Sequence, residues 1–266
     1  MRESRAERDP GLAAPLDRRL QILHALAING FMSVGALAAE TGVSEITVRR
    51  DLAQLESEGG IKRTHGGAIA RSIGDADTFE PAFEARRMQN AGAKQRIAQA
   101  AARLIRRGET VALDVGTTAL AFAEAIAGRD DIKVVTNNLR AARLLADTAI
   151  EVYVPGGRVR SREHAITGPM AAAALEAYWF DTAIIGVAGV SGEALYDYSP
   201  DDSEIKRVIM HRSRRVLVLA DAAKLGRKAM VEIAPLADAM MLVTDAAPAA
   251  ALGKALAARK GGVVVA

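Results

Sequence analysis

The chain of 266 residues contains no cysteine, which excludes disulfide bonds, thiolate metal ligands and cysteine nucleophiles. No apolar run approaches the ~18 residues that a membrane helix needs, and the charged segment 1–15 lacks the apolar core of a signal peptide. The histidines are too scattered to predict a metal site, since they are His24, His65, His164 and His211. We therefore expect a cytoplasmic protein with no membrane segment, no metal and no cofactor.

Net charge is also small, at +3 with a pI of about 9.3. Residues 1–71 hold ten Lys and Arg against nine Asp and Glu, so charge alone does not identify a nucleic-acid-binding protein. The basic residues of this segment nevertheless gather at 49–50, 62–63 and 71. A composition of 50% apolar and 25% charged residues is typical of globular proteins, and a chain of this length predicts two domains.

Three short helices are predicted at the start of the chain. After a flexible tail over 1–15, apolar residues recur from Leu16 at steps of three and four, and Gly30 is placed to end this first helix. Ser33 can cap a second helix that Gly42 ends, and Ser44 can cap a third. The pattern predicts a helix-turn-helix.

The third helix has an apolar side and a basic side. Val48, Leu52 and Leu55 recur at helical spacing and are expected to face the core, which turns the paired arginines outward. Residues 61–64 and 68–70 then read as two short strands around a tight turn, a basic wing. The DNA-contacting residues predicted from this arrangement are Ser44, Thr47, Arg49, Arg50, Lys62, Arg63 and His65.

Two motifs in this region resemble the DNA-binding signature of the DeoR family of bacterial repressors. They are TGVSEITVRRDL over 41–52 and RTHGGA over 63–68, at the family's spacing. The resemblance implies a winged helix-turn-helix domain over 16–71 that binds double-stranded operator DNA. A DNA-binding domain this small needs a second copy related by two-fold symmetry, so a dimer or tetramer is expected. Gly60 stands where the family usually has an apolar residue, which predicts looser packing at the base of the wing.

A linker is predicted over 72–92, followed by a helix from about 93 to 107 in the second domain, 93–266. Seven Lys and Arg and no acid occur from 86 to 107; this run is either a DNA-facing or dimer-facing patch or a solvated helix face. Apolar runs then alternate with helical stretches, at 110–114, 132–136, 150–154, 182–187, 215–220 and 240–244. The alternation predicts a mostly parallel α/β sheet with helices on both faces. Trp179 and Phe180 are expected in its core.

Polar residues and glycines follow several of these apolar runs. In parallel sheets ligands bind at the carboxyl ends of the strands, and a helix that begins after a glycine turn offers free N–H groups to a phosphate. The ligand residues predicted by position are Asp114, Gly116, Thr117, Thr118, Asn137, Asn138, Gly156, Gly157 and Lys224.

The same region resembles the sensor half of the DeoR family, whose fold is similar to that of ribose-5-phosphate isomerase. The resemblance adds Glu204 and Lys206 to the ligand residues and implies a phosphorylated sugar or polyol as inducer. Segments 195–198 and 225–231 resemble members that respond to glycerol 3-phosphate. Ala223 replaces the family's usual serine, so one hydroxyl contact is expected to be missing.

Two other functions remain open from the sequence. A sugar-phosphate isomerase with an added N-terminal module is one, because Asp114, Glu204, Asp221 and Lys224 are groups able to move protons. The DNA-binding signature would then be unexplained, and no catalytic residues are assigned. The other is a DNA-binding protein whose second domain only oligomerises, against which the Gly-Thr-Thr turn at 116–118 and Lys224 argue.

Overall fold

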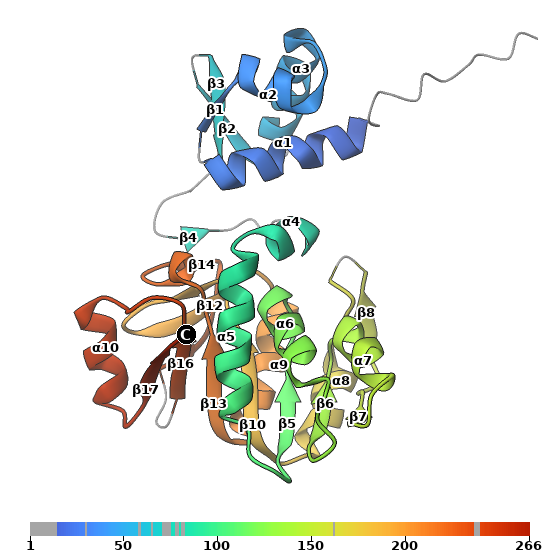
Figure 1. Cartoon of the computed structure of the whole chain (residues 1–266), viewed down its shortest axis with the longest axis vertical. Helices are drawn as coiled ribbons and strands as arrows, with labels where there is room; N and C mark the ends of the chain where they lie inside the picture. The colour runs from blue at the N-terminus through green and yellow to red at the C-terminus, as the bar shows by residue number, and fades with distance from the viewer. Residues whose placement is uncertain are drawn as a thin grey trace, which may run out of the picture. The chain divides into compact units, whose positions relative to one another are not determined.

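The computed structural model describes residues 15–29, 31–57, 60–64, 66–70, 76–77, 80, 83–161, 163–236 and 240–266. The chain divides into two compact units, Met1–Ser72 and Ile73–Ala266 (Figure 1). None of the helices in these described ranges has the length and apolar character needed to cross a membrane.

The first unit combines three helices with a small sheet. Its helices are α1 (Pro15–Asn29), α2 (Val34–Thr41) and α3 (Glu45–Ser57), and its strands are β1 (Phe31–Ser33), β2 (Ile61–Thr64) and β3 (Gly67–Ala70). The strands pair antiparallel in the order β1-β3-β2. The predicted helix-turn-helix and wing are therefore confirmed, and β1 is an additional strand that the sequence analysis missed.

Local capping explains where these helices begin and end. Ser33 Oγ accepts a hydrogen bond of 3.1 Å from Ala36 N at the start of α2. Gly42 ends α2 with φ at +68°, a conformation that glycine adopts without strain.

The core of this unit matches the predicted face of α3 and differs on α1. Val48, Leu52 and Leu55 are at most 3% exposed, as predicted. Leu20, which belongs to the apolar series that begins at Leu16, is 42% exposed, whereas Ile22, Ala25 and Leu26 form the buried face of α1. Looser packing was predicted at the base of the wing, where Gly60 lies. The space beside Gly60 is instead filled by Leu23, because a Cβ at Gly60 would lie 3.3 Å from Leu23 Cδ2.

The second unit contains a parallel sheet of seven strands in the order β17-β16-β13-β10-β5-β6-β7. Six of them correspond to the predicted apolar runs, which confirms the mostly parallel α/β fold, and β17 was missed. The strands are β5 (Thr110–Leu113), β6 (Lys133–Thr136), β7 (Glu151–Tyr153), β10 (Phe180–Gly186), β13 (Ser213–Leu219), β16 (Met240–Thr244) and β17 (Gly262–Val265).

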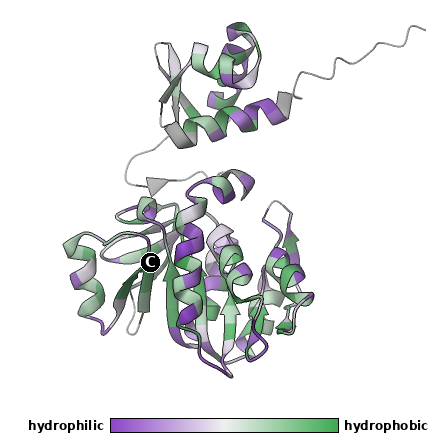
Figure 2. Ribbon diagram, viewed as in Figure 1, coloured by the Kyte–Doolittle hydropathy of each residue, from purple (hydrophilic) through white to green (hydrophobic). Residues whose placement is uncertain are grey.

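Helices cover both faces of this sheet. One core includes residues of α5 (Ala91–Arg103), α6 (Thr117–Ile126) and α7 (Leu139–Ala146), and the other those of α8 (Pro169–Glu176), α9 (Pro200–His211) and α10 (Ala250–Ala257). Figure 2 shows the hydrophobic strands between helices whose outer surfaces are more hydrophilic. Phe180 is fully buried as predicted, but Trp179 is 60% exposed because it precedes β10 and its ring faces the guanidinium of Arg212.

Shorter elements surround the carboxyl ends of the strands. They are β4 (Ala76–Asp77), α4 (Phe83–Met88), β8 (Arg158–Arg160), β9 (Ala165–Thr167), β11 (Gly189–Val190), β12 (Ala194–Asp197), η1 (Ala222–Lys224), β14 (Lys228–Ala229) and β15 (Val231–Pro235). Both β4 and α4 fall within the segment predicted as linker, and β4 pairs with β14. The helix predicted over 93–107 is α5, which begins two residues earlier and ends at Arg103.

Candidate functional site

A cleft that is partly open to solvent lies in the second unit where β5, β10 and β13 end. Residues that follow these three strands line it, among them Thr118, Val187 and Asp221. Residues from the α4–α5 region and from α9 complete its walls. The cleft therefore occupies the edge of the sheet at which the sequence predicts a ligand site.

The first turn of α6 presents unpaired backbone donors to this cleft. Gly116 precedes the helix with φ at +109° and has no side chain to cap it. The amides of residues 117–119, like those in the first turn of any α-helix, have no acceptor within the helix, and the Gly116 position supplies no side-chain cap for them. Thr117 and Thr118 line the cleft beside them, so amides, hydroxyls and the positive end of the helix dipole are available to an anion.

A buried ion cluster lies behind this turn. Lys206 on α9 is 2% exposed, and its ammonium contacts Asp114 Oδ2 and lies 3.1 Å from Asp197 Oδ2. Asp114 Oδ2 also accepts a hydrogen bond of 2.9 Å from Gly186 N. Burial raises the pKa of Asp114, and Lys206 opposes that shift. Burial by itself would lower the pKa of Lys206, but the surrounding carboxylates raise it above its usual value.

Asp202 extends the cluster into the cleft. Its side chain is buried, and Oδ2 accepts a hydrogen bond from Arg160 Nη2. Oδ1 accepts none from the described part of the chain. Burial raises the pKa of Asp202 to about 7, against the opposing effects of Lys206 and Arg160. Arg160 is shared, because its Nη1 donates to Glu80 Oε2 at 3.0 Å.

The segment that precedes α5 forms the opposite wall. Arg86 pairs with Glu80 at 3.1 Å and with Glu163 at 2.5 Å. Lys94 is 6% exposed, and its ammonium donates to the carbonyl oxygens of Arg86 and Gln89. Burial lowers the pKa of Lys94 to about 8; Asp221 opposes this shift, and Lys224 and Arg86 add to it.

The run of seven basic residues from 86 to 107 therefore contains side chains of two kinds. Arg86 and Lys94 line the cleft. This role differs from both predictions for the run, which were a DNA-facing or dimer-facing patch and a solvated helix face. Arg96 and Arg107 have the exposed side chains of a solvated face.

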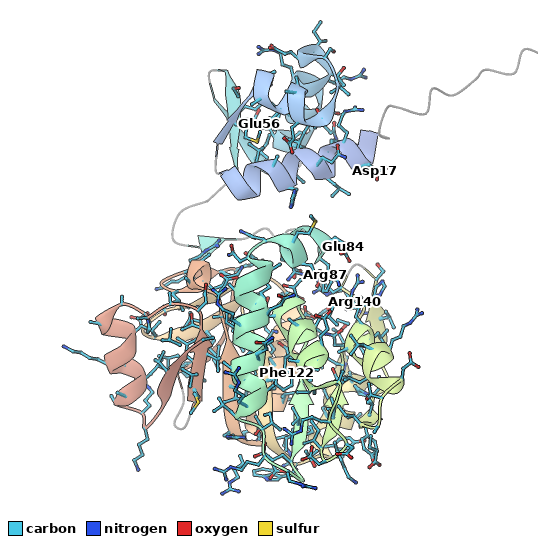
Figure 3. All side chains as sticks on the ribbon, in the orientation of Figure 1. Asp17, Glu56, Glu84, Arg87, Phe122 and Arg140 are labelled. Carbon is cyan, nitrogen blue, oxygen red and sulfur yellow. The ribbon has the colours of Figure 1, made fainter. Side chains whose placement is uncertain are left out.

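Contacts to neighbouring helices hold α4 in place (Figure 3). The guanidinium of Arg140 on α7 lies 4.1 Å from the centre of the Phe83 ring and 3.6 Å from Glu84 Oε1. Arg87 lies 3.8 Å from Glu124 on α6. The cleft wall at α4 is thus packed against α6 and α7.

The structure brings together some of the predicted ligand residues and separates others. Those that line the cleft are Gly116, Thr117, Thr118, Lys206 and Lys224, with Asp114 behind them. Asn137 Nδ2 donates to Ile166 O, and Asn138 Oδ1 accepts from the first amides of α7, so both side chains make structural hydrogen bonds. Gly156 packs against Met170, Gly157 against Ile166, and Glu204 is exposed on α9; none of the three is among the lining residues.

Sequence reasoning missed Arg86, Lys94, Asp197 and Asp202, four charged residues of the cleft. The i, i+4 spacing of Asp202 and Lys206 on the apolar side of α9 was an available signal, because charges among buried residues need partners. Arg86 falls in the predicted linker and carried no such signal.

The first unit presents the predicted polar face of α3. Ser44 Oγ accepts a hydrogen bond of 3.3 Å from Thr47 N, which caps the helix. Arg49 and Arg50 are exposed, and Arg49 lies 3.6 Å from Glu45.

The wing is joined to the same helix. Arg63 is exposed, and its amide donates to Glu56 Oε1 at 2.9 Å, with Glu56 labelled in Figure 3. The side chain of Lys62 and all of His65 lie outside the described residues.

Two family models match the chain. The "DeoR-like helix-turn-helix domain" matches residues 18–73, and the "DeoR C terminal sensor domain" matches residues 89–246. Together they span most of both units.

Curated relatives match over nearly the full length. The HTH-type transcriptional repressor CsqR of Escherichia coli is 35% identical over 237 residues, 88% of this chain and 89% of that protein. The glycerol-3-phosphate regulon repressor of Haemophilus influenzae is 32% identical over 87% of this chain and 89% of its own length. Among solved structures, ribose 5-phosphate isomerase A from Methanocaldococcus jannaschii aligns with a TM-score of 0.40 and 19% identity, over 52% of this chain and 55% of that one.

Proposed function

Because the chain belongs to the DeoR family of helix-turn-helix transcriptional regulators, we propose that it represses a sugar or polyol operon and leaves its operator when a phosphorylated inducer binds. The family consists of regulators and not of enzymes, so the isomerase alternative is wrong.

The observation that carries the inducer proposal is the first turn of α6. Its uncapped amides and the hydroxyls of Thr117 and Thr118 meet the cleft that Lys94 and Lys224 also line. A phosphate monoester would accept hydrogen bonds from the amides and hydroxyls, and the two ammonium groups would offset its charge. An unphosphorylated sugar has no anionic group that would use these amides, hydroxyls and ammonium groups together.

Names of relatives support the same class of ligand and target. Relatives at 31–32% identity include glycerol-3-phosphate regulon repressors from Escherichia coli and Haemophilus influenzae and a putative aga operon repressor. This chain is proposed to repress an operon of the same class, for a sugar or polyol.

On the DNA side, α3 enters the major groove, with Thr47, Arg49 and Arg50 at bases and flanking phosphates and the wing at the backbone. The exposed arginines of α3 support this assignment. One such helix reads one half-site, so the protein acts as a homo-oligomer with two-fold symmetry.

The cleft wall offers a route from inducer to DNA. Glu80 and residues 83–94 follow the DNA-binding unit in sequence, and Glu80, Arg86 and Lys94 line the cleft. An anion bound there would compete with Glu80 and Glu163 for Arg86 and draw Lys94 from the carbonyls it caps. The inducer shifts the DNA-bound equilibrium only as far as its affinities for the two arrangements differ.

The test is a thermal-shift screen of sugar and polyol phosphates against their unphosphorylated parents, followed by fluorescence anisotropy on operator DNA. We expect one phosphate to raise Tm and release the DNA while its parent does neither. The combined variant Thr118→Ala and Lys224→Ala should lose both effects and keep its affinity for DNA.

Lys133→Ala is the matched control. Lys133 is exposed, lies 3.0 Å from Glu151 at the start of β6, and does not line the cleft. An unchanged inducer response in the double variant would remove the cleft assignment. If no phosphate has an effect, the inducer proposal fails and the alternative of a second unit that only oligomerises is favoured.

A further inference from the structure

One buried carboxylate of the cleft has no role in holding a phosphate. Asp202 is 2% exposed and lines the cleft, and its Oδ1 accepts no hydrogen bond from any residue that the structure describes. A buried acceptor without a donor is unfavourable. The position therefore suits a ligand that brings an O–H donor to this atom.

The charges around Asp202 disfavour an anion at the same place. The buried cluster holds the carboxylates of Asp114, Asp197 and Asp202 against the cations of Lys206 and Arg160. Lys206 already contacts two carboxylates, and Arg160 is divided between Asp202 and Glu80. A second anionic group would meet carboxylates whose partner cations are already engaged.

The lining residues give this neighbourhood a different charge from the one that favours phosphate. Arg86, Lys94 and Lys224 are basic residues of the cleft wall, and Asp197 and Asp202 are acidic residues of it. Glu80 connects the two groups, because it pairs with Arg86 at 3.1 Å and with Arg160 at 3.0 Å. The cleft therefore has a basic part and an acidic part.

We infer that Asp202 is a specificity-determining residue: it accepts a hydrogen bond from an uncharged hydroxyl at the non-phosphate end of the inducer and rejects inducers with a carboxylate or second phosphate there. This inference rests on the proposed function, because it takes the phosphate to lie at α6. It narrows the ligand to phosphate monoesters of polyols or sugars and excludes phosphorylated sugar acids and bisphosphates.

Matched pairs of ligands test it. Each pair shares the phosphate and differs only in a terminal hydroxymethyl or carboxylate group: glycerol 3-phosphate with 3-phosphoglycerate, erythritol 4-phosphate with 4-phosphoerythronate, and glucitol 6-phosphate with 6-phosphogluconate. In whichever pair binds, titration calorimetry on the full chain at pH 8 should show at least about tenfold tighter binding of the ligand without the carboxylate. That ratio is a difference of about 1.4 kcal/mol in binding free energy. Asp202→Asn should bring the two members within about threefold of each other.

The neighbouring acid supplies the control. Asp201 lies in the same first turn of α9, pairs with Arg158 outside the cleft lining, and is more exposed. Asp201→Asn removes the same charge and should keep the preference. The Tm of the unliganded protein and its DNA affinity verify that Asp202→Asn is folded. Asp197→Asn leaves the ion pair between Asp202 and Arg160 intact, and it should also weaken the preference for the uncharged ligand.

The outcomes separate the two proposals. If a pair binds but wild type does not distinguish its members, or Asp202→Asn keeps the wild-type preference, the role of Asp202 is refuted while the phosphate cleft stands. If neither member of any pair binds and no other phosphate does, the proposed function fails and this inference fails with it.

Discussion

Arg18 on α1 and Asp51 on α3 form a buried two-point ion pair. Arg18 Nε lies 2.6 Å from Asp51 Oδ2 and Nη2 lies 3.3 Å from Oδ1, with both side chains 9% exposed. Asp51 is the acid of the Arg-Arg-Asp-Leu run, between the outward Arg50 and the buried Leu52. This acid therefore anchors α3 to α1 on the buried side of α3.

Asp51→Ala should destabilise the DNA-binding unit by about 3 kcal/mol, because it leaves the guanidinium of Arg18 buried without its carboxylate. Hydrogen exchange of the amides in α1 and α3 measures the loss, and operator affinity should fall with it. The apolar pair Arg18→Met with Asp51→Leu should recover much of both. A stable Asp51→Ala protein that still loses DNA binding would instead indicate direct contact with DNA.

Arg50→Ala should weaken operator binding and lower the slope of log K against log salt by about 1, since one phosphate contact is lost. The measurement is a salt titration by anisotropy. Arg107→Ala is the matched control, because it removes an arginine whose side chain is 88% exposed in the other unit. Equal slopes for Arg50→Ala and wild type would take Arg50 out of the interface.

Gly157→Ala and Gly116→Ala should fail in different ways. A Cβ at Gly157 would lie 2.8 Å from Ile166 Cγ2 and 2.9 Å from Thr167 O, so we expect a loss of about 2–3 kcal/mol in the free energy of unfolding. At Gly116 no atom lies within 4 Å of the added Cβ, and only the backbone opposes it, because φ of +109° with ψ of +169° lies in a region that essentially only glycine adopts, at a cost of about 1–3 kcal/mol. Denaturation checks stability, and the thermal shift with inducer should fall mainly for Gly116→Ala. A Gly157→Ala protein as stable as wild type would contradict the packing role.

Binding of a phosphate should be linked to proton uptake by Lys94. Because the pKa of Lys94 is about 8, its side chain is uncharged in part of the free protein molecules at and above that pH. A bound phosphate favours the charged form of Lys94. Inducer affinity should therefore fall as pH rises above about 8 and stay flat just below it. Calorimetry in buffers with different ionisation enthalpies counts the protons. Lys94→Met should abolish the uptake; persistent uptake in that variant would assign the proton to another group.

Local pattern was enough for most of the architecture. Helical periodicity, caps such as Ser33 and the glycine stop at Gly42 act within a few residues, so the sequence predicted the helix-turn-helix, the wing and six parallel strands. The Gly-Thr-Thr turn was also predictable, because a strand end followed by a helix start places it at the sheet edge. The family resemblance added Lys206, which local pattern alone did not single out.

Only the tertiary structure decided which charged side chains meet. Arg18 and Asp51 are 33 residues apart and Lys206 and Asp114 are 92 apart, so no local spacing relates them. Packing also gave Asn137 and Gly157 structural roles and brought Arg86 and Lys94 into the cleft wall. The physical reason is that periodicity and capping depend on neighbours along the chain, whereas burial, ion pairing and the pKa shifts of Lys94 and Asp202 depend on groups that only the completed fold brings into contact.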